Sequence, residues 1–393
     1  MKKISLYFAR YWQVVCLAFG LIALAGVLYG YGTATFLPGI SSAEQQVIAQ
    51  TTSFTDILKN PLWLPYKLLL LLFQALGSEG AQLRIVSGIC MSIAVFSFYA
   101  IAKRFYSPRV CVLTTILFAI SAPSITLARV ATPAVMLYSW IMFISLALWF
   151  RYSHKKRFAP FVFFVLATLL MYTPGTFWFV AILSILFWKD IPKLFKHLSR
   201  PFIIAGAVLG LVTAAPLFYS FVQDPNLIRS WLLLPTTFDS VSSLETLRTL
   251  PAAFFYTSSI DGRYNLGALP LLDAFSGTML LLGLYAYRKK LKLQRTIIYI
   301  TALMCSSALA VVNNSQLYLL LFLPIAYLII AEGIGFLLGE WRSVFPKNPI
   351  ARFVGTVVMS IAVIATSGYH LNRYFLAWVQ APETKAIYSE KTQ

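Results

Sequence analysis

The chain has 393 residues, of which 59% are hydrophobic and 11% are charged, and its mean hydropathy is +0.76. Soluble domains carry about 25% charged residues, so this composition excludes a soluble globular protein and indicates a membrane protein. The formal net charge is +19, with 32 cationic and 13 acidic residues.

Apolar runs of 16 to 22 residues recur along the whole sequence. They predict an all-α integral membrane protein, because a helix satisfies its backbone polar groups within lipid. The N-terminal run is long and has no convincing cleavage site, so we expect a retained first span instead of a signal peptide. About eleven spans are expected, at 12–32, 80–102, 109–126, 134–151, 158–173, 175–188, 202–222, 268–287, 296–312, 317–338 and 353–369.

The charges between these spans favour one orientation. The loops on one side hold 22 of the 32 cations and only Asp190 and Glu340 as acids, whereas the other loops hold ten cations and ten acids. Because cationic loops remain in the cytoplasm, we expect a multi-pass plasma-membrane protein with a cytoplasmic N-terminus and an extracytoplasmic C-terminus. The net charge then reflects orientation against anionic lipid, and a nucleic-acid partner is an unnecessary interpretation.

The first outer loop, 33–79, combines a polar run carrying Glu44 with a short apolar helix. We expect Leu68–Leu76 to lie along the membrane surface, because a full span here would move the following basic loops to the outer side. Trp63 and Tyr66 suit the interface, and Lys67 is expected to reach toward the lipid phosphates.

The second long outer loop is 223–267. Two long loops on one side predict a single active face above a helical base. A transporter or flippase is less favoured, because the halves show no matching broken segments and the spans hold few ionisable residues.

Four passages in chain order resemble the GT-C membrane glycosyltransferases, in the branch of bacterial protein O-mannosyltransferases, aminoarabinose transferases and RgtA-like lipid-A sugar transferases. They are ISSAEQQ followed by NPLWLPYKLLLLLFQALG, AQLRIVSGICMSIAVFSFYAIAKRFYSPR with Arg84, ISAPSITLARVATPAVM, and SSIDGRYNLGALPLLDAFSGTMLLLGLYAYRKK. The resemblance implies a GT-C-like transmembrane domain over residues 1–369 and a short extracytoplasmic tail over 370–393.

The resemblance also implies a reaction. A polyprenyl-phosphate sugar is the donor substrate, and a hydroxyl of an unknown glycan, lipid or protein acceptor attacks the sugar. The reaction requires a carboxylate to take the hydroxyl proton and cations to stabilise the departing phosphate. The family has Asp-Glu in the first outer loop; here Ala43 replaces the aspartate and leaves Glu44 as the implied catalytic base. Ala134 stands at a second position where the family often has aspartate.

The cations and polar residues that match the family passages are candidates for binding the lipid phosphate or the sugar. Arg84 has an alternative role as a structural partner of Glu79 or Asp56. Arg129 can likewise pair with Glu79, and Lys67, like Lys59, can be an interface anchor. The loop candidates can form a hydrogen-bonded turn. The full set is Lys67, Arg84, Arg129, Arg263, Tyr264 and Asn265.

Other polar residues favour structural roles. Glu332 lies within a predicted span and is expected to pair with a cation of an inner loop. The chain has no Asp-x-Asp sequence, and its histidines form no metal-binding set, so we expect no metal site. The cysteines lie in apolar runs without a pairing pattern and are expected to pack. These histidines and cysteines are His154, His197, His370, Cys16, Cys90, Cys111 and Cys305.

The tail carries Tyr374, Phe375 and Trp378, which predict a short helix at the membrane interface. The function predicted from the whole sequence is transfer of a sugar from a polyprenyl phosphate on the extracytoplasmic side. The alternatives are a catalytically silent relative that binds the lipid carrier or scaffolds an envelope complex and, third, a transporter or flippase.

Overall fold

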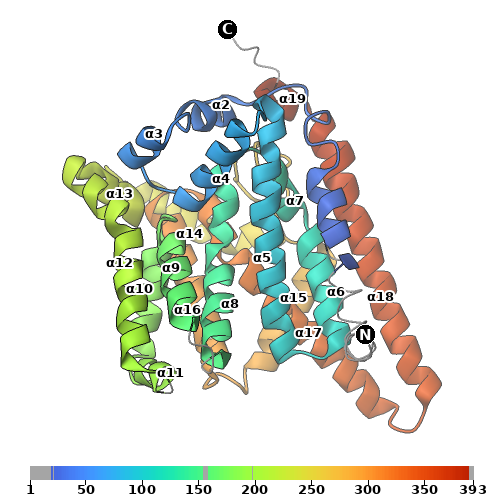
Figure 1. Cartoon of the computed structure of the whole chain (residues 1–393). Helices are drawn as coiled ribbons and strands as arrows, with labels where there is room; N and C mark the ends of the chain where they lie inside the picture. The colour runs from blue at the N-terminus through green and yellow to red at the C-terminus, as the bar shows by residue number, and fades with distance from the viewer. Residues whose placement is uncertain (1–18, 21, 154–157, 197, 389–393) are drawn as a thin grey trace, which may run out of the picture.

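The computed structural model describes residues 19–388 except 21, 154–157 and 197, and these residues form helices without strands (Figure 1). Cys16, His154, His197 and the first part of the predicted span 12–32 lie outside the described residues. The helices of the first half are η1 (Gly26–Gly30), α2 (Ser42–Ala49), α3 (Phe54–Lys59), α4 (Leu64–Ala75), η2 (Gly80–Leu83), α5 (Arg84–Phe105), α6 (Pro108–Ile120), α7 (Ala122–Arg129), η3 (Pro133–Tyr138), α8 (Ser139–Tyr152), α9 (Ala159–Met171) and α10 (Thr176–Leu186).

The second half continues the helical bundle and ends in short helices beside the first outer loop (Figure 1). Its helices are α11 (Ile191–Phe195), α12 (Arg200–Gln223), α13 (Asn226–Leu232), α14 (Ser240–Phe255), α15 (Ala274–Tyr287), α16 (Gln294–Val312), η4 (Gln316–Leu321), α17 (Leu323–Val344), α18 (Pro349–Asn372), η5 (Arg373–Trp378) and α19 (Pro382–Tyr388).

Six helical stretches of the described residues are long and apolar enough to cross a membrane, and the bent pair α6–α7 would make a seventh. The pair bends by 53° at Ser121, the residue before α7, and Pro123 is the second residue of α7. Every predicted span from residue 80 onward coincides with a helix, but the count of eleven is not confirmed. Helices α9, α10 and α15 have 13, 11 and 14 residues, whereas a straight crossing needs about 20.

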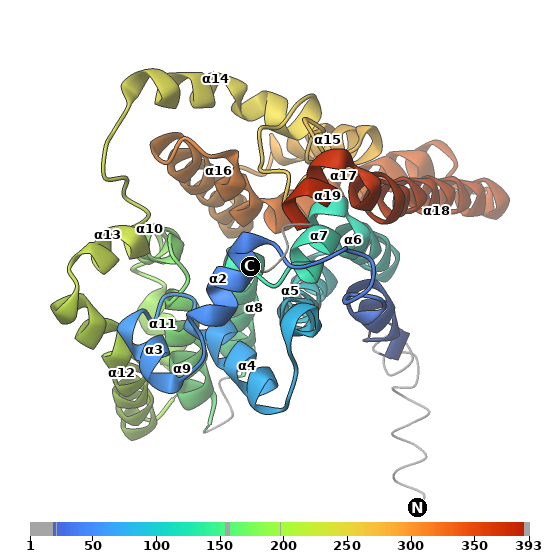
Figure 2. The same cartoon turned by 90° about the horizontal axis from the view of Figure 1, so that it is seen from above.

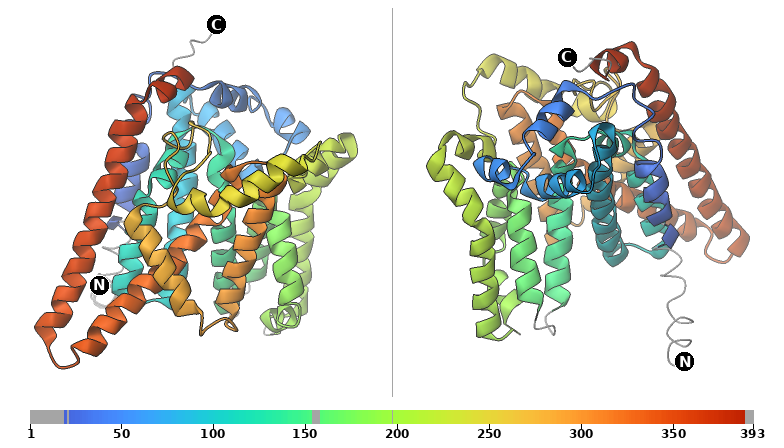
Figure 3. Two further views of the ribbon diagram at one scale, coloured as in Figure 1. Left: turned by 180° about the vertical axis from the view of Figure 1, so that it is seen from behind. Right: turned by 45° about the horizontal axis from the view of Figure 1, so that its top comes forward.

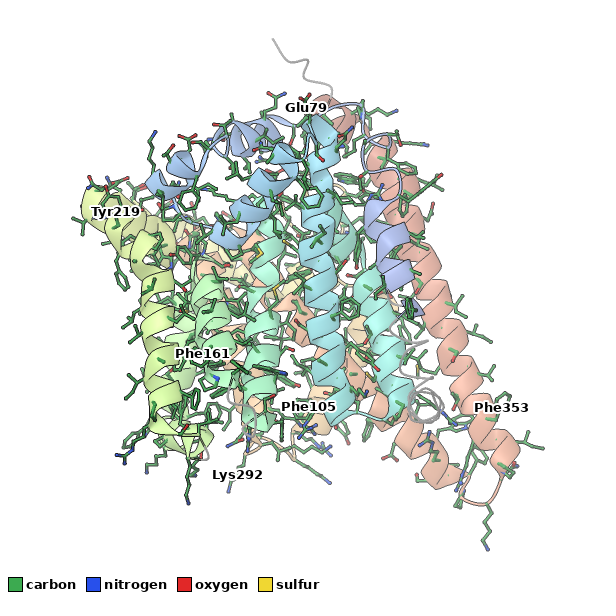
Figure 4. The ribbon with its side chains drawn as sticks, in the orientation of Figure 1. Glu79, Phe105, Phe161, Tyr219, Lys292 and Phe353 are labelled. Atoms are coloured by element: carbon green, nitrogen blue, oxygen red, sulfur yellow. The ribbon has the colours of Figure 1, made fainter. Side chains whose placement is uncertain are left out.

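The two ends of the bundle differ. Glu79 and Tyr219 lie at the end that carries α2, α3 and α4, here named the α4 end, whereas Lys292 and Phe353 lie at the opposite end, named the Lys292 end (Figure 4). Seen from above, α2 to α4 lie across the bundle and α14 passes around its edge (Figure 2). The two long loops predicted to share one side are therefore at one end of the molecule.

Helix α17 forms the centre of the fold, and every residue from Leu323 to Ile334 is buried. It packs closely on α15 through Gly283 and Gly333. A Cβ atom on either glycine would overlap backbone atoms of the other helix, so only glycine permits this separation.

The C-terminal segment does not form the expected interfacial surface helix. Helix α18 runs the length of the molecule and continues into η5, and α19 then lies against the first outer loop (Figure 3). Tyr374 and Trp378 are buried at 1% exposure, while Phe375 is half-buried. These aromatic side chains pack inside the α4 end, so the boundary expected at residue 369 falls within a continuous helix.

Candidate active site

Glu44 lies in the first turn of α2 and is completely buried. The local sequence Ser41-x-x-Glu44 forms a capping box. The Ser41 backbone N–H and hydroxyl donate to Glu44 Oε2 at 2.9 and 3.1 Å, while the Ser41 oxygen accepts from the Glu44 N–H. This motif turns the carboxylate back toward the start of its helix and into the protein.

Arg84 is the ion-pair partner of Glu44. Its Nε and Nη2 atoms donate to the two carboxylate oxygens at 2.8 and 3.0 Å, and both side chains are 0% exposed. The same guanidinium donates to the carbonyls of Thr33 and Gly39 at 3.0 and 2.6 Å. The structural role predicted for Arg84 is therefore present, but its partner is Glu44 instead of Glu79 or Asp56.

The segment Val130–Thr132, directly after α7, joins this pair to α5 and to the second outer loop. The Ala131 N–H donates to Glu44 Oε1 at 2.7 Å. The Ser87 hydroxyl of α5 donates to the Val130 carbonyl at 2.6 Å, and the Tyr264 hydroxyl donates to Thr132 Oγ1 at 3.2 Å. The passages carrying Glu44, Arg84, Arg129 and Tyr264 thus meet, although 220 or more residues separate the first from the last in sequence.

The two alanines at the family's aspartate positions flank this meeting point. Ala43 is half-buried beside Glu44, and Ala134 is buried in η3, two residues after Thr132.

The C-terminal segment covers the Glu44–Arg84 pair from another side. The Tyr388 ring lies 5.5 Å from the Arg84 guanidinium, and the Trp378 ring packs between Tyr374 and Tyr388. Trp378 Nε1 donates to the Gly262 carbonyl at 2.9 Å, which connects the segment to the second outer loop. Sequence analysis placed Tyr374 and Trp378 at the membrane interface and did not single out Tyr388, because nothing in their spacing distinguishes burial from an interfacial position.

Arg129 lies apart from Glu79 and within an aromatic enclosure. It is 1% exposed, with the rings of Phe36, Tyr374 and Phe375 centred 5.1 to 5.5 Å from its guanidinium. Its Nη1 donates to the Leu28 carbonyl at 2.9 Å and its Nε to the Tyr374 hydroxyl at 3.1 Å. Its Nη2 has no hydrogen-bond partner among the described residues.

Lys67 is also buried, at 6% exposure, which contradicts the expected extension toward the lipid phosphates. Its Nζ donates to the Asn60 carbonyl at 2.6 Å, because the left-handed residue Trp63 turns the chain back over α4. No carboxylate of the described residues pairs with it. Burial lowers the pKa of Lys67 to about 8.

An apolar groove of about 610 Å³ begins at α4 and follows α5, α8 and α9 toward the opposite end. Pro65 and Leu69, on either side of Lys67 in sequence, line its beginning. Further along it is lined by Ile93, Leu146 and Leu166, and Arg104 and Tyr152 lie at its far end. Lys67 is two residues from Pro65 and from Leu69 and does not line the groove, so the buried cation and the apolar groove lie on different faces of α4.

Arg263, Tyr264 and Asn265 belong to a turn that the chain itself stabilises. Arg263 pairs with Asp261 at 2.6 Å, and both side chains are about one-third exposed. Asn265 is buried and accepts from Arg373 Nη2 at 2.5 Å. The hydrogen-bonded turn given as an alternative is present, and Asp261, which was not a candidate, is its partly exposed carboxylate.

Burial raises the pKa of Tyr264, its hydrogen bond to Thr132 and the charge of Arg263 lower it, and the charges of Asp261 and Glu44 raise it. Both carboxylates therefore disfavour ionisation of the Tyr264 hydroxyl.

The expected pairing of Glu332 is confirmed, with Lys290 Nζ at 2.6 Å and Arg295 Nη2 at 3.6 Å. Among the described residues there is no group of three acidic, histidine or cysteine side chains placed to hold a metal.

Comparison with known proteins agrees with this architecture. Residues 59–219, which run from the end of α3 into α12, match the family described as dolichyl-phosphate-mannose-protein mannosyltransferase. Among curated proteins, none matches the sequence significantly. The chain has the GT-C fold of membrane glycosyltransferases, as the resemblance implied.

Two solved structures illustrate the likeness. ArnT from Cupriavidus metallidurans bound to undecaprenyl phosphate superposes with a TM-score of 0.54 at 12% identity, over 96% of this chain and 77% of that one. The apo state of the same protein gives a TM-score of 0.58 at 10% identity, over 95% and 77%.

Proposed function

We propose that the chain is a membrane glycosyltransferase that uses a polyprenyl-phosphate sugar as its donor. The observation that carries this proposal is Lys67, a buried cation without an acidic partner, on the helix whose Pro65 and Leu69 line the beginning of an apolar groove. An isoprenoid chain fits the groove, and its phosphate, beyond the groove's beginning, would reach Lys67 on the other face of α4 and supply the counter-charge that Lys67 lacks. The ArnT structure bound to undecaprenyl phosphate supports the same class of donor.

The reaction then follows from general chemistry. An acceptor hydroxyl attacks the anomeric carbon, the bond from that carbon to the phosphate oxygen breaks, and the lipid phosphate leaves with the bonding electrons. The Lys67 ammonium stabilises the charge that develops on the leaving phosphate. A carboxylate must take the hydroxyl proton during this step.

We propose a positioning role for Glu44 in place of the base role implied by the resemblance. A base needs an oxygen within hydrogen-bond reach of the hydroxyl, and both Glu44 oxygens are already occupied by Arg84, Ser41 and Ala131. Asp261 is the second candidate for the proton acceptor. Arg263 donates to both of its oxygens, but the Asp261 side chain is 38% exposed, so a hydroxyl can reach this carboxylate, whereas Glu44 is fully enclosed.

Arg129 and Arg84 are proposed to shape the site without contacting phosphate. Arg84 is saturated by Glu44 and two carbonyls, and Arg129 is enclosed by aromatic rings. Arg263 remains a candidate phosphate ligand, because its side chain is 34% exposed.

The test combines binding and turnover. The purified full-length protein is given a panel of radiolabelled polyprenyl-phosphate sugars, and donor binding and sugar release are measured for wild type, Lys67→Met and Lys59→Met. Lys59 is the matched control, because its side chain is 79% exposed. We expect about 10- to 100-fold weaker donor binding for Lys67→Met, as for one lost charge-assisted contact, and no change for Lys59→Met.

Three results would contradict parts of this proposal. Equal donor binding by Lys67→Met and wild type would remove Lys67 from the site. Binding without turnover on any donor would indicate the silent relative. Unchanged turnover in Asp261→Asn, together with a large loss in a correctly folded Glu44→Gln protein, would restore Glu44 as the base.

We further propose that the α4 end faces the extracytoplasmic side of the plasma membrane. The basic residues near Lys292 support this orientation through the positive-inside rule. Cysteines introduced at Ser53 and Thr246 should react with an impermeant thiol reagent in intact cells, and one at Lys292 should not. The reverse labelling pattern would overturn the orientation.

A further inference from the structure

A second pocket lies at the Lys292 end, far from α4. It has a volume of about 570 Å³ and lies where α6 begins, α17 ends and α18 begins. It includes Phe353, which lies at the foot of α18 (Figure 4). Its lining contains three arginines and no acid: Arg109, Arg342 and Arg352, with Ser107, Pro108 and Pro349.

The three arginines differ in how they are held. The Arg352 guanidinium donates to the carbonyls of Phe345 and Pro346, which fixes it beside the loop between α17 and α18. The side chains of Arg109 and Arg342 form neither hydrogen bonds nor ion pairs within the described part of the chain. Three positive charges therefore converge on one hollow without an acid to neutralise them, which favours an anionic ligand.

An apolar stripe continues from this pocket along α18. Val357, Ile361 and Ile364 follow Phe353 at spacings of four, four and three residues on one helix face. Ile361 and Ile364 are 60 and 69% exposed, and Val357 is half-buried. Phe353, which lines the pocket, is 68% exposed. The stripe offers apolar contacts to acyl chains for about three turns of the helix.

We propose that this pocket binds the phosphate of an anionic phospholipid, with its acyl chains along the α18 stripe. Basic pockets between membrane helices are suited to anionic headgroups. A free phosphate shares the chemistry of the headgroup, but it would gain nothing from the stripe. The ligand would join α6, α17 and α18 at the end of the molecule opposite the proposed sugar-transfer site.

The test measures lipid retention by the purified full-length protein in native mass spectrometry. Phosphatidylglycerol, phosphatidylcholine and inorganic phosphate are added separately to wild type, Arg109→Gln/Arg342→Gln and Arg200→Gln. Arg200 is the matched control, because it is an exposed arginine at the start of α12, away from the pocket. Each pocket arginine near the headgroup contributes roughly 1 kcal/mol, so retention of phosphatidylglycerol should fall about fivefold per arginine and about 25-fold in the double variant.

The expected pattern is preference of wild type for phosphatidylglycerol over phosphatidylcholine, its loss in the double variant and its persistence in Arg200→Gln. An undiminished preference in the double variant, or an equal loss in Arg200→Gln, would overturn the proposal. A further variant, Ile361→Ser/Ile364→Ser, separates the two phosphate sources. If it retains phosphatidylglycerol fully, and inorganic phosphate binds wild type as tightly as the lipid, the ligand is a free phosphate and the lipid assignment is wrong.

Discussion

Two buried cations at the α4 end differ in what surrounds them. Arg84 is enclosed by the two oxygens of Glu44 and two backbone carbonyls, whereas Lys67 has one carbonyl and no acid. Burying a charge costs free energy unless a partner offsets it. The chain supplies that partner for Arg84, and we propose that a ligand supplies it for Lys67. We name Glu44, Arg84 and their hydrogen-bond partners the frame, and we propose that the surroundings of Lys67 bind an anion.

The largest expected effect tests the frame. Glu44→Gln removes the partner of a fully buried arginine, so the free energy of unfolding should fall by about 3–5 kcal/mol. Urea unfolding of the purified protein, followed by circular dichroism, measures this loss. Glu245→Gln is the control, because it makes the same change at an exposed position of α14. Unchanged stability of Glu44→Gln would mean that the pair does not hold the fold.

A smaller effect is expected from filling the groove. Ala100→Trp places an indole at an exposed groove position, where it should displace roughly 50–80 Å² of apolar contact with the donor chain. At about 25 cal/mol per Å², donor affinity should fall roughly 10- to 30-fold in a lipid-binding titration. Ala205→Trp, exposed on α12 outside the groove, should leave affinity unchanged. Equal donor affinities of Ala100→Trp and Ala205→Trp would mean that the donor chain does not occupy the groove.

The pH dependence of donor binding tests Lys67 itself. Its folded-state pKa is lowered to about 8, so the ammonium is charged below pH 8 and loses its proton as the pH rises through that value. A phosphodiester donor keeps its charge over this range, so affinity should be constant below pH 8 and fall up to tenfold per pH unit above it. Titrations from pH 6 to 9.5 measure the slope, and Lys67→Met should abolish it. A slope that persists in Lys67→Met would assign the titration to another group.

The smallest effect is expected at the exposed turn. Arg263 and Asp261 form a partly exposed ion pair, so Arg263→Gln should change the free energy of unfolding by only about 0–1 kcal/mol. Its donor affinity, measured in the same titration, shows whether Arg263 contacts the phosphate. A loss of stability comparable to that of Glu44→Gln would place this turn in the frame.

The sequence predicts the positions of the membrane helices well, because apolar periodicity reports them locally. It predicts neither Glu44 burial nor its partner, since both depend on Arg84, 40 residues later, and on the Ala131 amide. A local signal for part of this was present: Ser41 and Glu44 have the spacing of a capping box, which directs the carboxylate toward its own helix start. No comparable local pattern predicts that the aromatic residues of η5 are buried.

The covering of the frame by the C-terminal segment has a consequence for biosynthesis. Tyr374 meets Arg129 across 245 residues, and Tyr388 meets Arg84 across a still longer interval. Such contacts form only after the helices between them have been made and inserted. The two arginines therefore lack their C-terminal aromatic neighbours for most of the time that the chain is being translated. A chain interrupted before Arg373 would leave this unfinished surface open, which gives quality-control proteases a means to distinguish it from the completed protein.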